Sequence, residues 1–102
     1  MTIPELFERV AAKVPEVRPV GLKHNGQHWW LDYYVVMDND AHMLIEAACW
    51  RLLPGYWWED QKLNSPGNRY VVHNSENAVA SRGASITEAL LLAVERVHGD
   101  KR

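Results

Sequence analysis

The segment that precedes the last predicted helix carries residue types that can hold an anion. Arg82 offers a planar pair of N–H donors, and Ser85 stands where the helix would begin. The first turn of a helix leaves backbone amides without partners and has the positive end of the helix dipole, so it attracts phosphate or carboxylate groups. A turn closed by a capping serine accounts for the same residues. The segment therefore predicts either an anion site or an ordinary helix cap.

Tryptophan is the second chemically suggestive residue type, because the chain has five in 102 residues. Four of them form two adjacent pairs, Trp29–Trp30 and Trp57–Trp58. Neighbours on a strand point to opposite faces, so one member of each pair is expected to face solvent, a partner subunit or a ligand. Exposed aromatic side chains stack on bases and anchor protein interfaces. The alternative is that all of them cover a sheet in a domain with short helices.

The predicted ligand-binding site combines these two features. Arg69, in a predicted hairpin, adds positive charge. A bound nucleotide would place its phosphate against Arg82 and Arg69, and its base against Trp57 or Trp58. The full predicted set is Trp57, Trp58, Arg69, Arg82 and Ser85.

The other candidate groups indicate neither a metal site nor catalysis. His24 and His28 are four residues apart, but the glycine-containing stretch between them does not favour a helix. No compact zinc pattern is present. Cys49, the only cysteine, lies within a predicted helix and away from any nucleophile motif, so a buried structural thiol is expected. We predict no catalytic residue, no metal, no cofactor and no enzymatic activity.

Composition places the chain among ordinary soluble domains. Of its 102 residues 47% are hydrophobic and 24% charged, and the formal net charge is −2. This weakly acidic balance argues against a nucleic-acid partner, which requires clustered Lys and Arg. No apolar run approaches the length of a membrane span, and no signal-peptide pattern is present. We therefore expect one domain, residues 1–102, in the cytoplasm.

Three helices are predicted from apolar residues that recur at helical spacing. The first begins at a capping box of Thr2 and Glu5, and the last at a capping box that starts with Ser85. The middle helix is apolar around most of its circumference, so we expect it to be buried on two sides or covered by a second subunit. The predicted ranges are 2–14, a helix from the capping residues 38–40 to about 53, and 85–99.

Three short strands are predicted at 56–61, 69–73 and 78–81, joined by turns rich in Asn, Ser and Gly. Turns this short join antiparallel neighbours. Residues 28–37 favour an extended segment, either a buried strand or a loop packed by its aromatic side chains. The predicted fold is α+β: a small antiparallel sheet of three strands, or four if 28–37 joins it, packed with three helices in the order α-α-β-β-β-α.

This order resembles the phage ABA sandwich domain, a family of small phage and prophage proteins. The resemblance rests on the helix at 38–47, the tryptophan-bearing strand at 56–58, the polar hairpins and the helix at 85–94, and it covers residues 2–98. The family has no agreed activity, so the resemblance implies a fold and a phage-like origin. Small phage proteins of this kind often act against host defences, by binding a host protein or sequestering a nucleotide signal.

Two concrete functional hypotheses follow, beside the third possibility of a minor structural or morphogenesis component of a phage. The first is a non-enzymatic phage-type counter-defence protein that, as a homo-oligomer in the bacterial cytoplasm, sequesters a small anionic, nucleotide-like ligand. The alternative is an inhibitor or adaptor that docks onto a host or phage protein through a Trp-rich surface. The residues predicted for a subunit or partner interface are Trp29, Trp30, Met43, Ala47 and Trp50.

Overall fold

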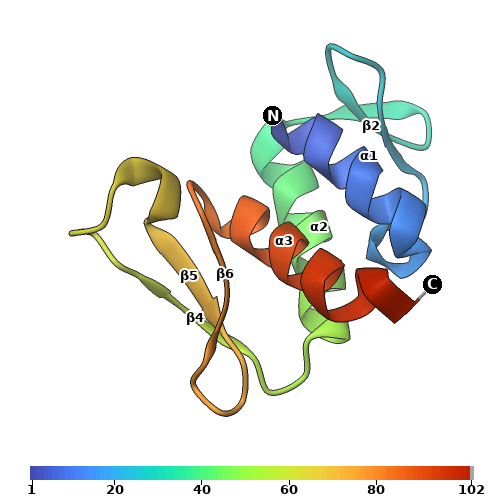
Figure 1. The fold of residues 1–102 in the computed structure, drawn as a ribbon. Coiled ribbons are helices and arrows are strands. Elements are labelled where there is room, and N and C mark those ends of the chain that lie inside the picture. Colours follow the sequence, from blue (N-terminus) through green and yellow to red (C-terminus); the bar gives the residue numbers. More distant parts are fainter. Residues whose placement is uncertain (102) are drawn as a thin grey trace.

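The computed structural model describes residues 1–101, which form three α-helices and two three-stranded antiparallel sheets (Figure 1). The predicted α+β class is confirmed. The predicted element order is only partly matched, because three strands lie between the first two helices as well as between the second and the third. Short 3-10 turns at Pro15–Val17, Pro66–Asn68 and Gly99–Lys101 complete the structure.

The helices are α1 (Ile3–Lys13), α2 (Asp38–Leu52) and α3 (Ile86–His98). Both predicted cap residues mark helix starts. Thr2 forms the full capping box with Glu5, whereas at α3 only the bond from the Glu88 backbone amide to the Ser85 hydroxyl forms, and the Glu88 carboxylate accepts from the Ala84 amide. The start of α2 differs from the prediction. Its N-cap is Met37, which makes no side-chain cap, and Asp38 already lies in the first turn, where its negative charge complements the positive end of the helix dipole.

The predicted meander forms the second sheet, in the strand order β4 (Trp57–Asp60), β5 (Tyr70–His73) and β6 (Val79–Gly83). One face of this sheet packs on α3, mainly through β5 and β6. Gly83 makes the close approach possible, because a Cβ atom there would lie 2.7 Å from the backbone nitrogen of Ala89. The other face is open, and β4 extends along the free edge (Figure 1).

Residues 28–37 depart from the single extended segment that was predicted. They form two strands, β2 (Trp29–Leu31) and β3 (Tyr34–Val36), and these pair with β1 (Leu22–His24) in a separate sheet. The meander sheet therefore gains no fourth strand. The two-residue turn Asp32–Tyr33 has no glycine, and Asp32 itself adopts the positive φ of 55° that the turn requires. Without a glycine signal, two three-residue strands read as one extended segment.

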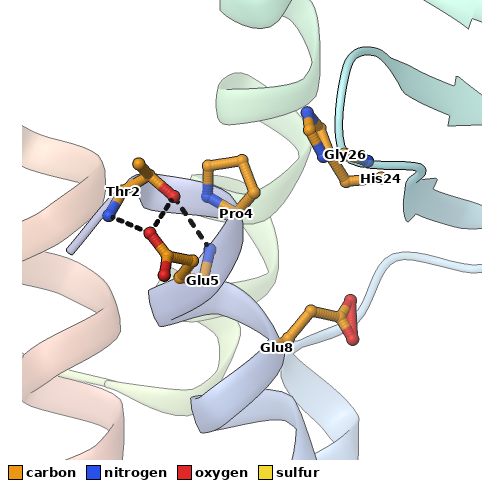
Figure 2. A pocket seen from close by; sticks show the side chains of 6 residues that line it. All are labelled: Thr2, Pro4, Glu5, Glu8, His24 and Gly26. Atoms are coloured by element: carbon orange, nitrogen blue, oxygen red, sulfur yellow. Dashed lines mark hydrogen bonds between the residues drawn. The ribbon is translucent and has the colours of Figure 1, made fainter.

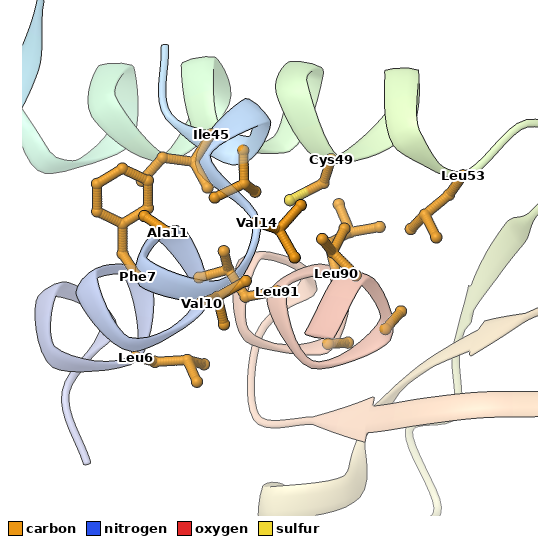
Figure 3. Packing of buried hydrophobic residues seen from close by; sticks show 14 of the residues in the cluster. Leu6, Phe7, Val10, Ala11, Val14, Ile45, Cys49, Leu53, Leu90 and Leu91 are labelled. Carbon is orange, nitrogen blue, oxygen red and sulfur yellow. The ribbon is translucent and has the colours of Figure 1, made fainter. Parts of the chain in front are cut away.

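The hydrophobic core lies between the helices and extends to both sheets. Helix α3 is central: it packs on the meander sheet with one side and on α1 and α2 with the other. Figure 3 shows side chains of the three helices meeting there, among them Phe7, Ile45, Cys49 and Leu90. Cys49 is fully buried, as predicted, and burial raises the pKa of its thiol to about 12.

Candidate functional site

The meander sheet separates the residues predicted to bind a nucleotide. Trp57 stands opposite His73 and Trp58 opposite Val72, so the two indole rings leave opposite faces of β4. Both tryptophans are partly exposed, at 40% and 45%: Trp57 lies on the face opposite α3, and Trp58 lies on the α3 face, where the helix packs mainly on the other two strands. One base therefore cannot stack on both rings.

The two arginines of the predicted site differ in their availability. The Arg69 guanidinium donates to both carboxylate oxygens of Asp60, at 2.6 and 2.8 Å. This hydrogen-bonded ion pair lowers the pKa of Asp60 and leaves little positive charge for a phosphate. Arg82 is exposed, with a long contact of 3.4 Å to the Gln61 side chain. The two guanidinium groups are not brought together around one ligand position.

Ser85 acts as the N-cap of α3. Its hydroxyl oxygen accepts from the Glu88 backbone amide at 3.2 Å, and the Glu88 carboxylate accepts from the Ala84 amide at 3.3 Å. These bonds occupy two amides at the start of the helix. An ordinary helix cap therefore accounts for the hydrogen bonds at the start of α3.

The open face of the sheet holds a polar cluster that was not predicted. Glu59 accepts from the side-chain amide of Gln61 at 2.5 Å and contacts His73 Nε2 at 2.9 Å, and these hydrogen bonds lower the pKa of Glu59. Trp57 stacks on the His73 ring, with centroids 4.1 Å apart and planes 12° apart. Its indole N–H donates to Asn77 at 3.1 Å. Only the strand register joins these residues, so no local sequence signal could have indicated the cluster.

A histidine beside a carboxylate is a common acid–base pair, but this one is not open to a substrate. His73 is 7% exposed, its Nε2 atom is bound to Glu59, and its Nδ1 atom is buried with no hydrogen-bond partner in the described part of the chain. Neither ring nitrogen can reach a bound molecule. The contact of His73 with Glu59 joins β4 to β5.

A hollow of about 660 Å³ lies between the start of α1 and the β1–β2 turn (Figure 2). Its polar side chains are already engaged: Glu5 closes the capping box with Thr2, and Glu8 is paired with Arg18. His24 accepts from the Gly26 amide at 3.0 Å. The hollow therefore presents no set of free polar groups aimed at a ligand, and no cluster of possible metal ligands is found among residues 1–101.

The residues predicted for an interface divide into buried and exposed groups. Trp29 is fully buried against Phe7 and His24, with ring centroids 5.5 and 4.9 Å away. Trp50 is half-buried and packs against the core. Trp30 is half-exposed on the outer face of its sheet, and Met43 and Ala47 are exposed on α2.

Several exposed apolar side chains, together with half-exposed Trp30, lie on the β2–β3 hairpin and the residue that follows it. We call this group the hairpin surface: Trp30, Tyr33, Tyr34, Val35 and Met37. Tyr33, in the turn, is 90% exposed, and Tyr34, on the edge strand, is 74% exposed. Trp30 and Val35 are cross-strand neighbours on the outer face. Of this group only Trp30 was predicted to lie at an interface. Residues 28–37 were predicted to form one extended segment, so the exposed turn that contains Tyr33 was not expected.

Charged groups border the hairpin surface. Asp32, Asp38 and Asp40 are all exposed, and none of them takes part in an ion pair within residues 1–101. Lys23 and Asn25 join Trp30, Asp32 and Tyr33 around a shallow hollow of about 370 Å³. The hairpin thus carries apolar side chains at its turn and on both of its faces, with Trp30 and Val35 on the outer face and Tyr34 on the opposite one, and a mainly acidic border.

Comparisons with known proteins assign no family, since no family model, curated protein or solved structure matches the chain. Within the described residues, every helix is too short or too polar to cross a membrane.

Proposed function

We propose that the protein is a non-enzymatic binding protein that docks onto another protein through the hairpin surface. The observation that carries this proposal is the exposure of two consecutive tyrosines on the β2–β3 hairpin, Tyr33 in the turn and Tyr34 on the edge strand. Soluble monomers rarely expose grouped apolar side chains without a use for them. Tyrosine and tryptophan are also the residue types most enriched among interface anchors.

The charges around the hairpin surface favour a partner with a basic rim. Asp32 lies in the turn and Asp38 and Asp40 lie just beyond β3, so the acidic groups stand at both ends of the strand. A partner that meets this surface would place an apolar patch over the tyrosines and lysine or arginine side chains at the margin. Such charges mainly affect the rate of association and its dependence on salt.

Sequestration of a nucleotide has less support from the geometry. Arg69 is paired with Asp60, the Ser85 hydroxyl caps α3, and the two adjacent tryptophans face opposite ways. In the phage setting that the family resemblance implies, the docking hypothesis corresponds to an inhibitor or adaptor of a host or phage protein.

Capture from bacterial lysate tests the proposal with matched variants. The wild type and a Leu63→Ser control, whose leucine is fully exposed on the β4–β5 loop, should recover the same stoichiometric protein. The double variant Tyr33→Ser/Tyr34→Ser should lose it at unchanged melting temperature, and higher salt should weaken the wild-type complex. Equal recovery by all three proteins, or recovery of no stoichiometric partner by the wild type, would contradict the docking function.

A further inference from the structure

The outer edge of β4 presents backbone groups that no other strand of residues 1–101 uses. The Gln61 backbone amide donates to the Arg69 carbonyl at 2.7 Å, which fixes the hydrogen-bonding phase of the ladder between β4 and β5. In an antiparallel ladder only alternate residues bond to a given neighbour. Trp57 and Glu59 therefore bond to β5, and the N–H and C=O groups of Trp58 and Asp60 point outward, away from the sheet.

Edge strands are usually protected by free charges, but the charges of β4 are already bound. Asp60 is held by Arg69, and Glu59 is held by Gln61 and His73. The opposite edge of the same sheet is protected in another way. There the Arg96 side chain of α3 donates to the carbonyl of Ala80, at 3.3 Å. Of the two edges of this sheet, β4 is therefore the one that is free to pair with a further strand.

We propose that two copies of this chain pair antiparallel through β4, with Trp58 of each copy opposite Trp58 of the other across a two-fold axis. The main-chain groups of the two Trp58 residues would then exchange hydrogen bonds. The two indole rings would lie side by side on the α3 face, in the space that α3 leaves uncovered over β4.

Hydrogen-bonding phase and charge select this register. Residues whose backbone groups point outward from β4 must pair with such residues of the second copy. The two-fold axis can therefore lie at Trp58, or one residue away at Trp57 or Glu59. An axis at Glu59 would place its carboxylate opposite that of the second copy, which is unfavourable. An axis at Trp57 would bring Asp60 against Pro54 in the turn after α2, where strand pairing ends. With Trp58 on the axis, Glu59 faces Trp57, and no like charges stand opposite one another.

The dimer would have a continuous six-stranded sheet, because three strands from each copy join at the axis. The axis is perpendicular to the sheet, so both α3 helices lie on the same face. The β2–β3 hairpin lies on the far side of the helices from this sheet, away from the β4 edge (Figure 1). The inference therefore does not depend on the proposed docking function, and it would give that function two identical binding surfaces.

Disulfide trapping tests the register while Trp58 is retained. In the proposed dimer Trp57 of one copy is the direct neighbour of Glu59 of the other, at a Cα separation of about 4.5 Å that a disulfide can span. A mixture of Trp57→Cys and Glu59→Cys chains, one of them tagged, should form the mixed disulfide faster than either chain links to itself. The native thiol of Cys49 is buried and should stay out of the reaction. Faster self-linking of the Glu59→Cys chain would overturn the proposed register.

The wild-type oligomeric state provides the second test. Sedimentation equilibrium across a concentration series should give a dimer that dissociates on dilution. Trp58→Lys should be monomeric with its thermal transition retained, because it places two positive charges at the axis, whereas the Leu63→Ser control, at an exposed position outside β4, should dimerise like the wild type. A wild type that stays monomeric throughout the series, or a Trp58→Lys variant that dimerises as tightly, would overturn the proposal.

Discussion

The Thr87 hydroxyl donates a 2.6 Å hydrogen bond to the Glu46 carboxylate and so joins α3 to α2. Thr87 is almost fully buried. A variant that lacks its hydroxyl would leave the Glu46 carboxylate without this donor. We expect Thr87→Val, which keeps the side-chain shape, to lower the free energy of unfolding by about 1–3 kcal/mol. Thr87→Ser retains the hydroxyl and should lose less. Urea denaturation of the three proteins measures the difference, and equal losses in the two variants would contradict a role for the bond.

The contact between Gly83 and α3 predicts a second stability effect. A methyl group at Gly83 would meet the Ala89 backbone, so Gly83→Ala must move the helix away from the sheet. We expect a loss of about 1–3 kcal/mol in the free energy of unfolding. Gly67→Ala is the matched control, because a Cβ atom there meets nothing within 4 Å. The control should stay within about 1 kcal/mol of the wild type. If both variants unfold at the same denaturant concentration, the close approach of Gly83 to α3 does not limit the stability of the fold.

The adjacent tryptophans Trp29 and Trp30 should differ in their effect on stability. Trp29 packs inside the core against Phe7, whereas Trp30 lies on the outer face of the sheet. Trp29→Ala should cost about 3–5 kcal/mol, because it leaves a cavity in the core. Trp30→Ala should cost about 1 kcal/mol or less. Thermal denaturation followed by circular dichroism checks this order, and a greater loss in Trp30→Ala would reverse the assignment of the two faces.

The contact of Glu95 with Arg9 and Lys13 predicts a pH dependence. Burial opposes ionisation of Glu95, but hydrogen bonds from Lys13 and Arg9 outweigh it and lower the pKa of the carboxyl. A lowered pKa in the folded state stabilises the protein above the unfolded-state value, and that contribution is lost as pH falls through the folded-state pKa. The melting temperature of Glu95→Gln should therefore lie below that of the wild type at neutral pH.

The difference between Glu95→Gln and wild type should close as pH falls below the ordinary glutamate value of about 4.3. Melting curves of both proteins across the acidic range measure it. Arg51→Gln, at an exposed arginine outside the ion pairs of the described residues, controls for the general effect of changing one charge. A gap between wild type and Glu95→Gln that is independent of pH would contradict the assignment.

Local sequence signals predicted the helices and the meander sheet well, because most of these elements are bounded by capping or turn residues; the start of α2, which has no side-chain cap, is the exception. Thr2 with Glu5 and Ser85 with Glu88 mark helix starts, and residues 64–68 mark the turn between β4 and β5. The first sheet could not be predicted in the same way. Its β2–β3 turn relies on Asp32 in a conformation that glycine usually supplies, and its strands are too short to show alternation.

The candidate sites were less predictable, because they depend on strand register and on which strands lie at the edges of the sheets. Nothing in the sequence pairs Arg69 with Asp60 or Glu59 with His73, since both contacts cross between strands. The exposure of Tyr34 has a similar origin. Its position in the pleat matches that of buried Leu22 and half-buried Leu31, but β3 is an edge strand and nothing covers the tyrosine.

The central position of α3 constrains when the protein can fold during its synthesis. The helix that covers the meander sheet and closes the core against α1 and α2 spans residues 86–98, and it follows every strand and both other α-helices of the described chain. A nascent chain that stops short of this segment has two apolar surfaces with nothing between them. Folding must therefore follow translation of this helix, and until then the emerging polypeptide is a substrate for chaperones and proteases.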